Sequence, residues 1–233
     1  MKNFDKIPAE YKKEEFRLDE EGKVDIFRIP GTNLVYKEIA LPALEKYFIE
    51  LEKLKSDVFV FPQELVYVKN VFMGYLMEFI QGVMIKNIDP NILIPELFAM
   101  LKEVEKGIID LTKKSVKIVD INVKNIIITP EKKMKVVDTD LFEVTSEDPY
   151  MIRRDNFTDY NDTIMDIVVK EIIRKFGSFM DRYIQEIYEA CVYSEVSASY
   201  CLEKMKEYLQ NRFGEELNTL DELKNALSLA AKR

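Results

Sequence analysis

The chain has 233 residues, a formal net charge of −8, and a composition that is 47% hydrophobic and 33% charged. This length allows one domain or two small lobes with a proper core; the composition excludes a disordered or fibrous protein, and the acidic balance argues against a general nucleic-acid binder. The chain has no histidine, which excludes imidazole catalysis and histidine-ligated zinc, so any catalysis must use carboxylates, lysines, hydroxyls, backbone amides or an oxygen-ligated metal.

The first part of the chain has the pattern of β-strands. Three runs rich in β-branched and aromatic residues, EEFRLD, VDIFRI and LVYKEIA, lie within residues 14–40. The turn sequences Glu20–Lys23 and Pro30–Asn33 separate them. We expect these runs to form an antiparallel meander.

A helix and two further strands are predicted next. Apolar residues recur at helical spacing from Leu41 to about Lys55, namely Leu44, Phe48, Leu51 and Leu54. The following runs FVFPQELVYV and NVFMGYLMEFI are typical of strands and flank a turn at Lys69–Asn70. The pattern over residues 1–80 therefore predicts three strands, then a helix, then two strands.

Beyond Gly82 the pattern is mainly helical. Pro95–Ser115 is a long amphipathic segment, and VKIVD, NIIIT and MKVVDTD then predict short strands about a turn at Pro130–Lys133. From Asp159 onward the chain is predicted to be helical almost throughout, with breaks near Gly177, Ser194 and Gly214.

The order of these elements predicts an α+β protein of two lobes. Residues 1–80 would form a small β-rich lobe with one main helix, and residues 81–233 a larger helical lobe that carries a hairpin. Ligand sites are common in the cleft between two such lobes.

The same residues indicate a cytoplasmic protein without a membrane partner. No run approaches 18 consecutive apolar residues, and the charged start of the chain lacks the apolar stretch of a signal peptide. Cys191 and Cys201 are too few for a disulfide scaffold and show no metal-binding spacing.

The segment Val119–Phe142 carries the residues suited to chemistry. Asp120 opens a loop, Asn125 directly precedes one predicted strand, and Asp138 ends the next. A tight turn between these strands would bring Asn125 and Asp138 together at one end of a hairpin. An amide and a carboxylate are hard oxygen ligands, so this arrangement predicts a magnesium site beside a phosphate. Asp120 would remain as a carboxylate able to accept a proton from a hydroxyl.

The Asp-x4-Asn spacing and the later aspartate resemble the catalytic loop and metal-binding motif of the protein-kinase-like fold. The resemblance is sharpest to bacterial serine/threonine kinase-like proteins with an Asp-x-Asn-x-x-Asn loop and an Asp-x-Asp-x-Phe motif, which read DINVKN and DTDLF here. It covers roughly residues 14–175 and implies the two-lobed kinase-like architecture, with ATP and Mg²⁺ bound between the lobes.

The resemblance assigns roles to the catalytic and metal-binding positions. Lys37, in LVYKEIA, would hold the α- and β-phosphates of ATP. Asp120 would act on the acceptor hydroxyl, and Asn125 and Asp138 would hold the metal. Asp140 is either a second metal ligand or a loop carboxylate.

The resemblance also assigns the nucleotide pocket. Met77 would be the gatekeeper, and the backbone of Glu78, Phe79 and Ile80 would face adenine. Gly22 is the one glycine kept in the phosphate-covering loop. The glutamate that pairs with the lysine is expected at Glu50, although an ungapped reading puts Tyr47 in its place.

The sequence also departs from the family pattern. Ile118 and Val119 replace the histidine and arginine before the catalytic aspartate, and no Ala-Pro-Glu element follows. A full peptide-docking activation segment is therefore expected to be missing. Asp159 or Asp162 would anchor the catalytic loop, or alternatively cap a helix.

These observations predict an ATP- and Mg²⁺-dependent phosphotransferase, most specifically a bacterial- or phage-type serine/threonine protein kinase. Its partner would be a hydroxyl-bearing acceptor, with a protein favoured over a small molecule. One alternative is a small-molecule kinase like the aminoglycoside and choline phosphotransferases. The other is a nucleotide-binding pseudokinase.

Overall fold

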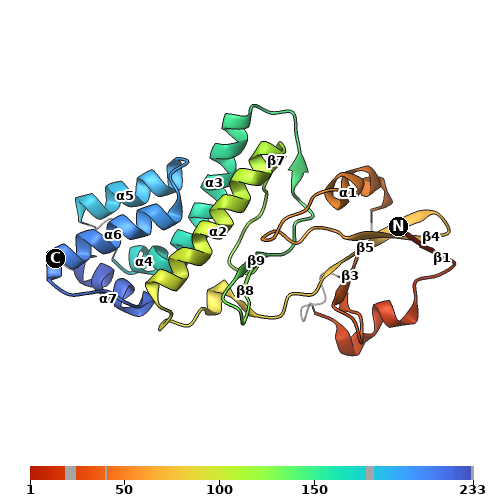
Figure 1. Ribbon diagram of the computed structural model, residues 1–233, viewed down its shortest axis with the longest axis horizontal. Helices are drawn as coiled ribbons and strands as arrows, with labels where there is room; N and C mark the ends of the chain where they lie inside the picture. Colours follow the sequence, from red (N-terminus) through yellow and green to blue (C-terminus); the bar gives the residue numbers. More distant parts are fainter. Residues whose placement is uncertain (19–24, 40, 177–180, 232–233) are drawn as a thin grey trace.

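The computed structural model describes residues 1–18, 25–39, 41–176 and 181–231. It is an α+β structure in which a mixed sheet and one helix lie at one end and a group of helices at the other (Figure 1). The expected α+β class is therefore confirmed.

The main sheet has the strand order β1-β4-β5-β3-β2. Strand β1 pairs parallel with β4, and all the other neighbours are antiparallel. Alternating residues bury both faces, since Val35 and Lys37 point to one side of the sheet while Tyr36 packs with Tyr11 and Phe27 on the other. The strands are β1 (Lys2–Phe4), β2 (Ile26–Arg28), β3 (Leu34–Glu38), β4 (Glu64–Val68) and β5 (Val71–Glu78).

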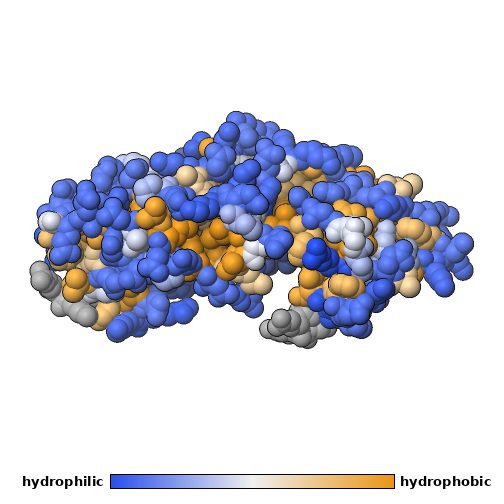
Figure 2. Space-filling model, turned by 60° about the horizontal axis from the view of Figure 1, so that its bottom comes forward, coloured by the Kyte–Doolittle hydropathy of each residue, from blue (hydrophilic) through white to orange (hydrophobic). Residues whose placement is uncertain are grey.

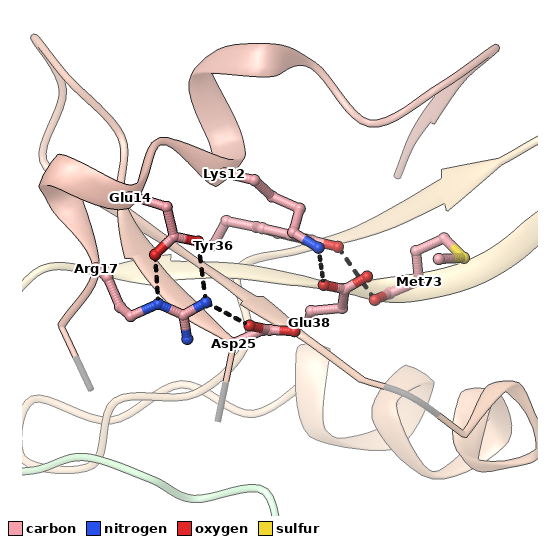
Figure 3. A network of polar contacts seen from close by, with 7 residues as sticks. All are labelled: Lys12, Glu14, Arg17, Asp25, Tyr36, Glu38 and Met73. Atoms are coloured by element: carbon pink, nitrogen blue, oxygen red, sulfur yellow. Dashed lines mark hydrogen bonds and ion pairs between the residues drawn. The ribbon is translucent and has the colours of Figure 1, made fainter. Parts of the chain in front are cut away.

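The predicted three-stranded meander over residues 14–40 is wrong in its first strand. Glu14–Phe16 forms a 3-10 helix, η2, and only an isolated bridge joins Arg17 to Phe27. Charge explains the difference, because the Arg17 guanidinium binds Glu14 at 2.8 Å and Asp25 at 2.9 Å, which folds the chain back on itself (Figure 3). The expected turn at Glu20–Lys23 lies outside the described residues.

Helix α1 (Glu45–Glu52) covers the face of the sheet to which Lys37 points. It is shorter than the predicted helix from Leu41 to Lys55, and the 3-10 turn η3 (Pro42–Leu44) precedes it. Phe48 anchors it, with its ring centroid 5.2 Å from that of Tyr75. Burial of this aromatic ring fixes where α1 sits on the sheet.

The helical region follows the predicted order with one early start. Helix α2 (Ile94–Lys113) confirms the expected long helix to within two residues. Helix α3 (Pro149–Met165) begins well before the predicted Asp159, because the carboxylate of Asp148 caps it by accepting the Tyr150 N–H at 2.8 Å. A single π-helical stretch (Asp166–Lys170) then continues α3 into α4 (Glu171–Phe176).

Two of the predicted helix breaks are confirmed. Helix α5 (Arg182–Tyr193) stops at Ser194, and α6 (Ala198–Phe213) ends at Gly214, whose φ of 73° makes it a left-handed cap. The break at Gly177 lies outside the described residues. Helix α7 (Leu220–Ala231) packs against α4 and α6.

Short strands lie on both sides of α2 in the chain, and those that follow it lead to α3. Strands β6 (Val83–Met84), β8 (Ile126–Ile128) and β9 (Met134–Val136) form one small sheet, and the antiparallel β8–β9 pair confirms the predicted hairpin. Strand β7 (Val116–Lys117) pairs with β10 (Glu143–Val144).

The surface is mostly hydrophilic, although hydrophobic residues form a band across the middle of the face in Figure 2. Among the helices in the described ranges, none is long and apolar enough to cross a membrane.

Candidate functional site

Lys37 is the fourth of the five residues of β3 and lies directly opposite Tyr75 of β5. Its side chain is only 8% exposed. The two strands approach so closely that a Cβ at Gly74 would stand 2.1 Å from the Lys37 carbonyl oxygen, and Gly74 adopts a φ of 149°. Glycine at this position therefore permits the backbone arrangement that presents Lys37.

Two carboxylates meet the Lys37 ammonium. Asp138 Oδ1 pairs with Lys37 Nζ, and Asp140 Oδ2 lies 2.7 Å from it. Asp138 directly follows the β8–β9 hairpin and has a left-handed φ of 61°. Between the two aspartates, the Thr139 hydroxyl donates to the Val60 carbonyl at 2.8 Å, which fixes the motif against the chain that leads into β4.

Lys37, Asp138 and Asp140 shift one another's pKa values. Burial opposes the Lys37 ammonium, but Asp140 and Asp138 outweigh it and raise the lysine pKa. Burial and the neighbouring Asp138 raise the pKa of Asp140 to about 6. The pKa of Asp138 is lowered despite its burial, because Asp140 and Lys37 favour its ionised form. Asp138 therefore holds its charge more firmly than Asp140.

Asn125 lies at the open end of the hairpin, where its carbonyl accepts the N–H of Val137, the residue before Asp138. Its side-chain amide nitrogen donates to the Asp120 carbonyl at 3.0 Å, which leaves its side-chain oxygen as an acceptor. The oxygen Oδ1 of Asp140 is buried and has no hydrogen-bond partner. The side-chain oxygens of Asn125 and Asp138 are hard donors that suit magnesium, which prefers one or two carboxylates completed by phosphate and water.

The donor set is nevertheless sparse on its own. Within the described ranges, no group of three or more carboxylates or thiols is placed to hold a metal ion. A magnesium ion here would need Asn125, Asp138 and the oxygens of a bound phosphate together. The residues therefore fit a magnesium ion only where phosphate and water oxygens complete its ligands.

Asp120 lies in the loop between β7 and β8, with an exposed side chain and a left-handed φ of 62°. Its carboxylate accepts the side-chain amide of Asn122 at 3.2 Å. The side-chain amide of Asn125 donates to the Asp120 carbonyl, and this hydrogen bond links the loop to the end of the hairpin that carries Asp138.

Two residues of α3 anchor this loop, and sequence reasoning missed both. Asn156 is fully buried; it accepts the Ile118 N–H at 2.7 Å and donates to the Val116 carbonyl at 3.0 Å. The Thr163 hydroxyl donates to the Ile121 carbonyl at 2.7 Å. Asn156 and Thr163 lie two helical turns apart on one face of α3. A helix predicted to begin at Asp159 excludes Asn156, so this spacing could not be recognised from the sequence.

Asp159 and Asp162 were expected to anchor this loop or to cap a helix, but they lie inside α3, which Asp148 caps, and they line a cavity beside Asp120. The cavity measures about 330 Å³ and lies between the loop, α3 and the end of α5. Burial and the neighbouring Asp155 and Asp162 raise the pKa of Asp159. The cavity is lined by Asp120, Ile121, Thr158, Asp159, Asp162, Thr163, Val192 and Tyr193.

The expected adenine-facing segment lies at the end of β5. Met77 is buried in the main core and pairs with Val35. Glu78 and Ile80 are half-buried, while the Phe79 N–H already donates to the Asn33 carbonyl at 3.1 Å. Gly22, expected to cover the phosphates, lies outside the described residues.

Glu50 is not brought to Lys37. Its side chain is 51% exposed and pairs with Lys53 of the next helical turn at 2.7 Å. The direction of α1, set by Phe48, turns Glu50 towards solvent, so the expected Lys37–Glu50 pair is replaced by the pairs with Asp138 and Asp140.

Comparisons with known proteins add no family to this geometry. A scan against models of protein families and a search of curated proteins both found no match. The case for a function rests on Lys37, Asp120, Asn125 and Asp138 themselves.

Proposed function

We propose that the chain is an ATP- and Mg²⁺-dependent phosphotransferase of the protein-kinase-like type. One observation supports this most directly. The buried ammonium of Lys37 sits against Asp138 and Asp140, at the hairpin end where Asn125 also lies and to which the Asp120 loop is bonded. A fixed cation, oxygen ligands and an exposed carboxylate are the groups that phosphoryl transfer requires.

Each residue would perform one part of the reaction. Lys37 would bind the α- and β-phosphates and neutralise charge as it moves towards the leaving oxygen. Asn125 and Asp138 would hold the magnesium ion, which supplies charge neutralisation at the phosphates when bound. The Asp120 carboxylate would orient the acceptor hydroxyl and take its proton, while the hydroxyl oxygen bonds to the γ-phosphorus and ADP leaves.

The acceptor could be a protein, as the family resemblance implies, or a small molecule. The second class is supported by the cavity of about 330 Å³ at Asp120, a volume within the range of small-molecule sites. The segment from Phe142 to α3 is short, and β10 ties it to β7, so it adds little surface for an extended peptide.

Transfer of label from γ-labelled ATP tests the proposal. The protein would be incubated with Mg²⁺ and with generic protein substrates, amino sugars or choline in separate reactions. Label in protein supports the protein kinase, and label in a small alcohol supports the small-molecule kinase. Binding of ATP without any transfer would instead support the pseudokinase.

A further inference from the structure

The glutamates of helix α1 all bind partners other than Lys37. Glu50 pairs with Lys53, and Glu52 accepts the Leu65 N–H at 3.3 Å. Glu45 lies beside the Tyr67 hydroxyl, whose pKa is raised to about 12 by burial and by this carboxylate. In the protein-kinase-like fold, a glutamate of this helix pairs with the strand lysine.

Aromatic side chains fill the space between α1 and Lys37. Phe48 packs against Tyr75, the cross-strand neighbour of Lys37, and Tyr75 is 1% exposed. The hydroxyl of Tyr47 donates to the Phe142 carbonyl, so α1 also bonds to the chain beyond Asp140. Replacing these rings by a glutamate would bury a charge in an apolar contact, which is costly.

Asp140 supplies to Lys37 the carboxylate that the glutamates of α1 do not. Its Oδ2 lies 2.7 Å from Nζ, and the two side chains are 15% and 8% exposed. The residues around it are held on both sides, because Thr139 donates to Val60 and the Phe142 ring packs 5.6 Å from that of Phe59. A carboxylate held this firmly can define the position of a flexible lysine.

We propose that Asp140 is the positioning residue for Lys37, and that it acts from the Asp-x-Asp motif in place of a helix-borne glutamate. Magnesium would then be held by Asn125 and Asp138 without Asp140. The effect on catalysis rests on the proposed function, but the ion pair itself does not. Asp140 and Asp138 belong to one short segment, so this clamp on Lys37, the Asp140–Lys37 ion pair, needs no carboxylate from α1.

The first test measures Lys37 without nucleotide or turnover. The protein would be treated with a limiting amount of an acetylating ester, and acetylation of each lysine followed by mass spectrometry. Asp140→Asn should speed acetylation of Lys37 at least about tenfold, the loss expected for one hydrogen bond to a charged group. Glu50→Gln is the matched control and should leave Lys37 unchanged, while the exposed Lys53 reports general reactivity.

The second test separates positioning from metal binding. Asp140→Asn should lower kcat about 100-fold, as misplacement of a catalytic group does, and leave the half-saturating Mg²⁺ concentration within twofold. Asp138→Asn should raise that concentration at least about tenfold. Asp140→Glu, which keeps the charge, should recover part of the lost kcat.

Two results would overturn the proposal. One is an unchanged acetylation rate of Lys37 in Asp140→Asn, and the other is a shift in Mg²⁺ dependence as large as that of Asp138→Asn. If Asp140→Asn does not fold, Asp140→Glu provides the acetylation test, with slow Lys37 acetylation expected and fast acetylation counting against the clamp. A parent protein that transfers no phosphate would refute the proposed function, while the acetylation result would still decide the clamp.

Discussion

The backbone N–H of Val137 donates to the carbonyl oxygen of Asn125 at 2.8 Å, one residue beyond the last paired residues of strands β8 and β9. This bond holds the two strands together up to the residue before Asp138. Asn125 and Asp138 therefore lie at the same end of the hairpin. A substitution of either residue should weaken the binding of a ligand that contacts both.

Asp138→Ala should abolish the Mg²⁺-dependent part of nucleotide binding, because it removes the carboxylate that keeps its charge most firmly. In the parent, ATP with Mg²⁺ at 100 times its dissociation constant should add about 2.7 kcal/mol to the free energy of unfolding. Thermal denaturation with and without Mg²⁺ measures this difference. Asp110→Ala, at an exposed ion pair with Lys113, is the control, and an equal Mg²⁺ response in both variants would contradict the metal assignment.

Asp120→Asn should preserve nucleotide binding and cut phosphoryl transfer at least ~100-fold, since it removes the proton acceptor. Asparagine tolerates the left-handed backbone that Asp120 adopts, so the fold should persist. Thermal denaturation with ATP and Mg²⁺ and label transfer from ATP would be measured on the same preparation. Transfer that survives intact would leave the kinase proposal standing and refute Asp120 as the base.

Asn156→Ala should destabilise the protein by about 3 kcal/mol, because it leaves a buried N–H of Ile118 and a buried carbonyl of Val116 without partners. Turnover should fall further than stability alone explains, since the loop that carries Asp120 loses its anchor. Urea denaturation and label transfer measure the two effects. Asn211→Ala, at an exposed position of α6, should change neither, and a stability of Asn156→Ala equal to that control would refute the anchoring role.

Glu105→Gln should change how stability depends on pH. Glu105 is buried in α2 and accepts the N–H and hydroxyl of Ser199 at 2.8 and 2.6 Å, yet burial outweighs these bonds and raises its pKa. The folded state therefore holds the Glu105 proton more tightly than the unfolded state, and this contribution to stability is lost as pH rises through the folded pKa.

Glutamine is neutral throughout, so Glu105→Gln should gain stability relative to the parent as pH rises from about 4 to 7. Urea denaturation at several pH values would show it. Glu103→Gln, on the exposed side of the same helix, should track the parent, and parallel curves for all three proteins would contradict the prediction.

Local patterns predicted the parts of the site that are close in sequence. The hairpin that joins Asn125 to Asp138 needs only two short apolar runs and a turn at Pro130–Lys133, all contained in one segment. Lys37 was likewise placed on a strand by its own neighbours. These features depend on short-range preferences that residue patterns record.

The features missed depend on distant contacts. Strand β1 contains a lysine, an asparagine and one apolar residue, which is not a strand pattern, and it forms through its pairing with β4, far along the chain. The expected Lys37–Glu50 pair does not form because the packing of Phe48 on Tyr75, a residue of a distant strand, sets the rotation of α1. The anchors Asn156 and Thr163 were hidden by a helix start placed too late.

The place of β5 at the centre of the sheet has a consequence during synthesis of the chain. Strands β1 and β4 form one ribbon and β2 and β3 another, and among the described strands of this sheet β5 is the one that pairs with both. Until Val71–Glu78 has left the ribosome, the nascent chain can form at most two separate ribbons. Isolated two-stranded ribbons are only marginally stable in water. The sheet, and with it the setting of Lys37, should therefore appear in a single step when β5 leaves the ribosome.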